Sequence, residues 1–182
     1  MPHIRPFLVV NLVVIPTTIL ALIGLFTVAH AADPLAAAPG AGRPVPNLCF
    51  TDHSDQPLCL SQWRGRAVLL NLWATWCVPC GKEMPQLDRL QARFGSPAFE
   101  VVALSVDRRG APAVMHYFNR NSLHHLAVYV DVEVRATENL SARGIPISLL
   151  IDRNGRIVER IRGAIDWESP DRLALIRQLI GP

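Results

Sequence analysis

Two cysteines separated by two residues, Cys77 and Cys80, are the side chains whose type and spacing point most directly to chemistry. They follow an apolar run over 67–73 and precede a stretch over 81–94 that is typical of a helix. A helix N-terminus at this junction would stabilise a thiolate on Cys77, because its unpaired N–H groups and its dipole attract negative charge. Cys80 lies within one helical turn and could close a disulfide with Cys77. The pattern therefore predicts a dithiol that exchanges electrons with other dithiols.

The same spacing also forms half of a zinc site. A structural zinc would need a second pair of ligands at compact spacing, but Cys49 and Cys59 are ten residues apart. The histidines His116, His124 and His125 form no ligand pattern with these cysteines. We therefore favour redox chemistry over zinc binding, and we expect neither a metal nor another cofactor.

The composition sets the broad class of the protein. Half of the 182 residues are hydrophobic, which is enough for one domain with a substantial core. The net charge of +3 gives no argument for binding nucleic acid. We expect one folded domain that works as a monomer.

The N-terminus carries a targeting pattern. Arg5 precedes a long apolar stretch over 7–29, and the A-x-A triplet that signal peptidases cleave follows at 29–31. Residues 1–31 are therefore either a cleaved signal peptide or an N-terminal membrane anchor, since about 20 apolar residues span a bilayer. Both alternatives export the domain to the periplasm, because the positive end stays inside. A flexible linker rich in Ala, Pro and Gly should follow over 32–46, and the folded domain over 47–182.

Strand-like and helix-like segments alternate along this domain. This order, with a hairpin near each end, predicts an α/β fold in which helices flank a mixed central sheet. The expected strands are 47–51, 57–60, 67–73, 99–106, 126–130, 147–151 and 156–161, and the expected helices are 81–94, 112–120, 133–142 and 170–179.

Several motifs now combine into a family resemblance. The sequence NLWATWCVPC over 71–80, the KEMP that follows at 82–85 and Gly144-Ile145-Pro146 occur in one order, followed by LIDRNG over 150–155 and by Gly163 and Trp167. In these motifs the chain resembles the thioredoxin superfamily, and within it the exported TlpA/ResA-like disulfide reductases. The resemblance covers 47–182 and implies a thioredoxin-like fold with an inserted strand–helix element within 107–130. It also implies protein substrates with disulfides, typically apocytochrome c or copper-site assembly proteins.

The two cysteines have different expected roles. The thiolate of Cys77 should attack the substrate disulfide, and Cys80 should resolve the mixed disulfide by attacking Cys77. Trp76 shields the pair, and Pro79 stiffens the dipeptide between the sulfurs, so both should border the bound substrate.

The resemblance adds three further site residues. It implies that Pro146 is a cis proline against the cysteine pair, and that the backbone of Ile145 is exposed to pair with an extended substrate. Glu83 lies three residues after Cys80 and shares its helix face. The resemblance places a glutamate at this position near the resolving sulfur, although a surface glutamate is the alternative.

Two positions depart from the common patterns. Asn71 stands where cytoplasmic thioredoxins carry a buried aspartate. Ile147 and Ser148 stand where the TlpA/ResA-like family usually has threonine.

Cys49 and Cys59 flank the first predicted hairpin. If its turn centres on Ser54, the two cysteines face each other across the strands. An oxidising compartment would allow a structural disulfide between them. Two buried free cysteines are the alternative.

The residues between the redox cysteines bear on the direction of electron flow. Val78 and Pro79 offer no basic group to stabilise a very acidic thiolate of the kind that makes DsbA an oxidant. We therefore expect a reductase that receives electrons from a membrane thiol reductant. The alternatives are a DsbA-type oxidant, or a metal-binding assembly protein on the same fold.

Overall fold

The computed structural model describes residues 42–181. The predicted signal peptide or anchor over 1–31 and the predicted linker up to residue 41 lie outside the described residues. Within 42–181, no helix is both long and apolar enough to cross a bilayer. The strands are β1 (Cys49–Asp52), β2 (Pro57–Cys59), β3 (Ala67–Trp73), β4 (Phe99–Ser105), β5 (Tyr129–Val130), β6 (Ile147–Ile151) and β7 (Ile157–Arg162). The helices are the 3-10 helix η1 (Leu60–Trp63) and the α-helices α1 (Val78–Phe94), α2 (Gly110–Arg120), α3 (Arg135–Asn139) and α4 (Pro170–Ile180).

The described strands form one mixed sheet in the order β2-β1-β5-β4-β3-β6-β7. The central strand β3 runs parallel to β4 and antiparallel to β6. The hairpins β1–β2 and β6–β7 lie at the two edges. The predicted α/β class, mixed central sheet and N-terminal hairpin are therefore confirmed, and the segment over 107–130 supplies α2 and β5.

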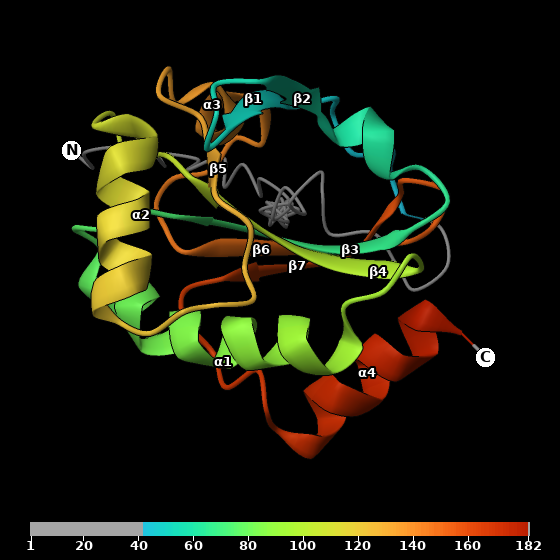
Figure 1. Ribbon diagram of the computed structural model, residues 1–182. Helices are drawn as coiled ribbons and strands as arrows, with labels where there is room; N and C mark the ends of the chain where they lie inside the picture. Colours follow the sequence, from blue (N-terminus) through green and yellow to red (C-terminus); the bar gives the residue numbers. More distant parts are fainter. Residues whose placement is uncertain (1–41, 182) are drawn as a thin grey trace, which may run out of the picture. The chain divides into compact units, whose positions relative to one another are not determined.

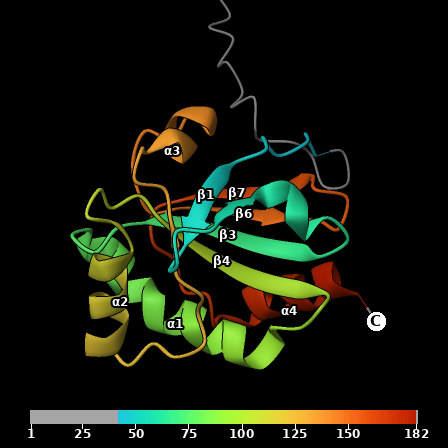
Figure 2. The ribbon, with the colours of Figure 1, turned by 45° about the horizontal axis from the view of Figure 1, so that its top comes forward.

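Strand β3 lies within the central sheet between helices on both faces (Figure 1). Its side chains alternate between two hydrophobic cores. Leu69 and Trp73 belong to the core that α1, α2 and α4 cover. Leu70 and Leu72 belong to the opposite core, beneath η1 and α3. Figure 2 shows α1 and α4 on one face of the sheet and α3 on the other. Because both faces of β3 are buried, its sequence is a nearly unbroken apolar run. Burial of each leucine side chain stabilises the fold by about 1.5–3 kcal/mol.

Strand β5 is shorter than the predicted 126–130. The carboxylate of Asp88, on α1, accepts hydrogen bonds from the backbone N–H groups of His125 (2.8 Å) and Leu126 (3.0 Å). These groups are therefore bonded to a side chain and not to a neighbouring strand, so regular pairing begins only at Tyr129.

Helix α3 is likewise shorter than the predicted 133–142. Val134 precedes it with a left-handed backbone (φ 61°), and Ser141 beyond its end is also left-handed (φ 48°). A right-handed helix cannot continue through either conformation. These two residues therefore limit α3 to a little over one turn.

The described part of the predicted linker pairs with the β6–β7 hairpin. The backbone N–H of Val45 donates to the carbonyl of Gly155 (2.9 Å), and that of Ile157 donates to the carbonyl of Arg43 (2.9 Å). Backbone pairing in the domain therefore begins at Arg43, before the boundary that we expected at Asn47.

The first hairpin brings Cys49 and Cys59 together. They are directly opposite each other in the β1–β2 register, with Cα atoms 4.0 Å apart, and a disulfide joins them. The disulfide covalently links β1 to the edge strand β2.

We predict that the Cys49→Ala/Cys59→Ala variant unfolds more readily than the wild type. A disulfide that spans ten residues removes loop-closure entropy from the unfolded chain and should stabilise the fold by about 3 kcal/mol. Urea unfolding of both proteins, with the Cys77–Cys80 disulfide kept oxidised, measures the difference. An unchanged free energy of unfolding, or two free thiols at these positions in the purified wild type, would contradict this prediction.

Candidate active site

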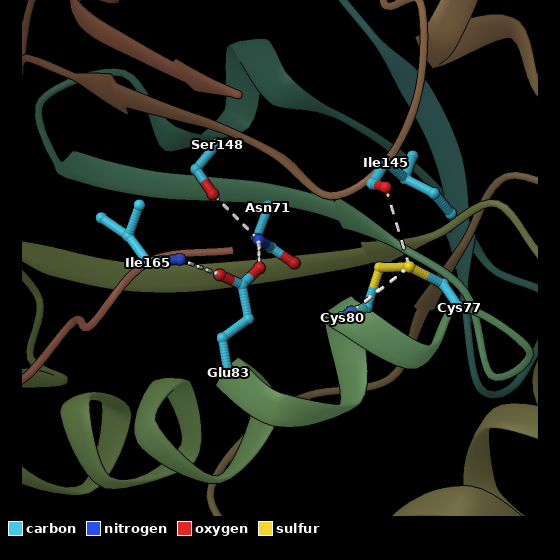
Figure 3. Close-up of a disulfide and its surroundings, with 7 residues drawn as sticks. All are labelled: Asn71, Cys77, Cys80, Glu83, Ile145, Ser148 and Ile165. Carbon is cyan, nitrogen blue, oxygen red and sulfur yellow. Dashed lines mark hydrogen bonds between the residues drawn. A yellow bond between two sulfur atoms is a disulfide. The ribbon is translucent and has the colours of Figure 1, made fainter. Parts of the chain in front are cut away.

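The start of helix α1 holds a second disulfide, between Cys77 and Cys80 (Figure 3). Cys77 is the N-cap residue, so the helix begins at Val78, three residues before the predicted 81. The backbone N–H of Cys80 donates to Sγ of Cys77 at 3.3 Å. First-turn N–H groups have no acceptor inside the helix. They can therefore stabilise negative charge on Cys77 whenever the disulfide is open.

The two sulfurs differ in access. Cys80 is fully buried, whereas Cys77 keeps 7% of its surface exposed. The neighbouring Trp76 and Val78 are 64% and 76% exposed, and Pro79 is also exposed. Cys77 is therefore accessible from a partly apolar surface, whereas Cys80 is shielded from it.

The loop between α3 and β6 completes this surface. The Ile145–Pro146 peptide bond is cis, as the resemblance implied. The carbonyl oxygen of Ile145 lies 3.8 Å from Sγ of Cys77. The structure therefore places the Ile145 backbone directly beside the sulfur that a substrate would meet.

Glu83 lies inside the protein, one helical turn after Cys80. Only 1% of its surface is exposed, so the alternative of a surface glutamate is wrong. Oε1 accepts a hydrogen bond from Nδ2 of Asn71 (2.7 Å). Oε2 accepts from Nε1 of Trp167 (3.2 Å) and from the backbone N–H of Ile165 (3.3 Å). Both carboxylate oxygens are thus held by donors.

Asn71 connects Glu83 to the next strand. It faces Ser148 in the β3–β6 register, and its Nδ2 also donates to Oγ of Ser148 (2.9 Å). Its own Oδ1 has no hydrogen-bond partner among the described residues, although it is buried. In Figure 3 this oxygen is on the side of Asn71 nearer the disulfide.

The roles of Ser148 and Trp167 were not anticipated. Ser148 was noted only as a departure from a family pattern, and Trp167 only as part of a motif. The register of two strands creates the first contact, and 84 residues separate Trp167 from Glu83. No local sequence signal links partners at that distance.

The surroundings of Glu83 act on its pKa in opposite directions. Burial raises the pKa, because the charged form loses its hydration, and the hydrogen bonds from Asn71, Ile165 and Trp167 partly offset this effect. The net pKa is higher than that of an ordinary glutamate. A carboxylate of this kind, on the helix face of Cys80, is suited to exchange a proton with that thiol.

We predict that Glu83→Gln changes how stability depends on pH. A raised pKa means that the folded protein holds the Glu83 proton more tightly than the unfolded chain does. The wild type should therefore lose stability as the pH rises through the folded pKa. Glutamine cannot titrate, and rotation of the Asn71 amide would present its unpartnered Oδ1 to the new N–H group. The variant should gain stability relative to the wild type as the pH rises.

Urea unfolding of the oxidised proteins between about pH 4 and about pH 8 tests this prediction. Glu138→Gln is the matched control, because Glu138 is exposed on α3. Its stability difference from the wild type should stay constant with pH. If the free energy of unfolding of Glu83→Gln relative to the wild type is equally constant with pH, the prediction is wrong.

Comparisons with known proteins agree with this geometry. The sequence profile of the Redoxin family matches residues 40–176. The thiol-disulfide oxidoreductase ResA of Bacillus thuringiensis (strain Al Hakam) is 34% identical over 122 residues, which cover 67% of this chain and 69% of that protein. ResA of Bacillus subtilis (strain 168) is 28% identical over 124 residues, covering 68% of each chain. The crystal structure of a protein from Chlorobium tepidum assigned as thiol:disulfide interchange protein DsbE has a TM-score of 0.69. It is 25% identical, with 79% of this chain and 100% of that chain covered.

Proposed function

We propose that this chain, which belongs to the Redoxin family, reduces disulfides in proteins outside the cytoplasm. The relatives confirm the resemblance to the thioredoxin superfamily and to ResA, and they make the chain a thiol–disulfide oxidoreductase. We further infer the direction of electron flow, the export of the protein and the identity of its substrates.

The main support for this mechanism is that Cys77 is partly exposed to solvent, whereas Cys80 is fully buried. In the reduced protein, the Cys77 thiolate attacks one sulfur of the substrate disulfide and releases the other as a thiolate. Cys80 then attacks Sγ of Cys77, which frees the second substrate sulfur. The substrate disulfide is thus reduced to two thiols, and the Cys77–Cys80 dithiol is oxidised to a disulfide. Glu83 accepts the proton that Cys80 must lose.

The two residues between the sulfurs support the reducing direction. Val78 and Pro79 are exposed and uncharged, so they add no positive charge to the stabilisation that the helix N-terminus provides. A reductant in an oxidising compartment needs an electron supply, and a membrane thiol reductant fits this need. Export itself is supported by the targeting pattern over 1–31 and by the Cys49–Cys59 disulfide, a bond typical of exported proteins.

We predict a reduction potential nearer the roughly −270 mV of thioredoxin than the roughly −120 mV of DsbA. Equilibration of the protein with glutathione buffers, followed by alkylation of the free thiols at Cys77 and Cys80, measures the potential. A value near that of DsbA would make the protein an oxidant and overturn the proposed direction.

Substrate identity can be tested by trapping. Cys80→Ser removes the resolving sulfur, so substrates should accumulate as mixed disulfides on Cys77. Identification of the captured proteins by mass spectrometry tests our proposal that they include apocytochrome c or copper-site assembly proteins. The Cys77→Ser/Cys80→Ser variant is the control for adducts on Cys49 or Cys59. Equal trapping by Cys77→Ser alone would contradict the assignment of Cys77 as the nucleophile.

A further inference from the structure

A hollow of about 560 Å³ opens beside the redox disulfide. Trp76, the residue before Cys77, lines it, and so does Ile145, whose carbonyl lies 3.8 Å from Sγ of Cys77. Val106 extends the apolar part of the lining. Its size is that of a binding site for a small group or a few side chains. A polypeptide whose disulfide meets Cys77 would therefore place neighbouring residues in or over this hollow.

The lining carries an excess of positive charge. It includes three arginines, Arg108, Arg109 and Arg143, and Asp107 as its one acidic residue. Arg109 binds Asp107 through two contacts, Nε to Oδ1 (3.1 Å) and Nη2 to Oδ2 (2.8 Å). Thr75 also bonds to both of these side chains.

These contacts settle the charge of the Asp107–Arg109 pair. The Arg109 guanidinium holds the pKa of Asp107 far below its usual range, so this carboxylate stays ionised and offsets the charge of Arg109. Arg108 and Arg143 are exposed, and neither has an ion-pair partner within 42–181. The lining of the hollow therefore keeps two uncompensated positive charges.

Arg143 and Ile145 also line a second hollow, of about 230 Å³, together with Pro146. The residues beside the disulfide are therefore shared between two adjoining depressions. Arg143 is two residues from Ile145, whose carbonyl oxygen lies 3.8 Å from Sγ of Cys77. Because an extended chain advances about 3.3 Å per residue, we expect a side chain one to three residues from the attacked cysteine to come close to Arg143.

We propose, on the basis of the proposed reductase function, that Arg108 and Arg143 select substrates with an acidic side chain close to the target cysteine. The occupant is an extended polypeptide segment whose aspartate or glutamate meets the guanidinium groups. Arginine suits this role because its planar fork binds a carboxylate through two parallel hydrogen bonds. Trp76 and Val106 would contact the apolar parts of the same segment.

Three synthetic peptides can test the proposal. Each carries the same internal disulfide, and they differ at one position, two residues before the first cysteine, where they have glutamate, glutamine or lysine. The reduced full-length protein is mixed with each peptide, and the second-order rate constant for release of peptide thiols is measured. We expect glutamate to be about fivefold faster than glutamine, with lysine slowest, and we expect this preference to shrink at high salt.

Arg108→Gln/Arg143→Gln should bring the ratio of the glutamate rate to the glutamine rate close to one. Arg120→Gln is the matched control, because it removes a positive charge from the exposed end of α2, outside the hollow. It should leave both the ratio and the basal rate unchanged. Equal rates for the three peptides with the wild type, or equal loss of preference in the double variant and the control, would overturn this substrate selection while leaving the reductase function intact. Failure to reduce any of the three peptides would instead refute the reductase function, and the selection with it.

Discussion

The pairing of β3 with β4 on one edge and β6 on the other is the constraint on which the site depends. The end of β3 leads to Cys77 at the start of α1, and the start of β6 follows Pro146. Because Leu72 pairs with Ile147 in the register, the disulfide and the Ile145 carbonyl meet at the same end of the sheet. A shift of one residue would exchange the buried faces of the strand and separate Asn71 from Ser148.

The same pairing makes a buried carboxylate tolerable. An ionised group away from water is costly unless hydrogen bonds surround it. Glu83 receives those bonds from two separate parts of the fold: Asn71 on β3, and Ile165 and Trp167 in the loop between β7 and α4. These hydrogen bonds stabilise the ionised carboxylate but do not fully offset the cost of its burial. The pKa of Glu83 therefore stays raised, and the group gains a proton more readily than an ordinary glutamate. A fully compensated carboxylate would be a poor proton acceptor for Cys80.

Patterns that are local in sequence were the ones that could be predicted. The apolar run of β3, the helix after the cysteine pair and the hairpin that aligns Cys49 with Cys59 follow from neighbouring residues. The contacts of Trp167 and Ser148 could not be derived, because they depend on how distant segments are packed. Asp88 illustrates the same limit: its carboxylate bonds to His125 and replaces the strand pairing that an apolar segment suggested.

The place where the chain enters the domain gives the molecule two distinct ends. Residues 43–45 pair with Gly155 and Ile157, around the turn that follows Ile151. Strand β6 runs from Ile147, next to the disulfide loop, to Ile151, next to this entry point. The fold therefore has one end that holds the Cys77–Cys80 disulfide and an opposite end where residue 43 enters the domain, and the length of strand β6 separates them.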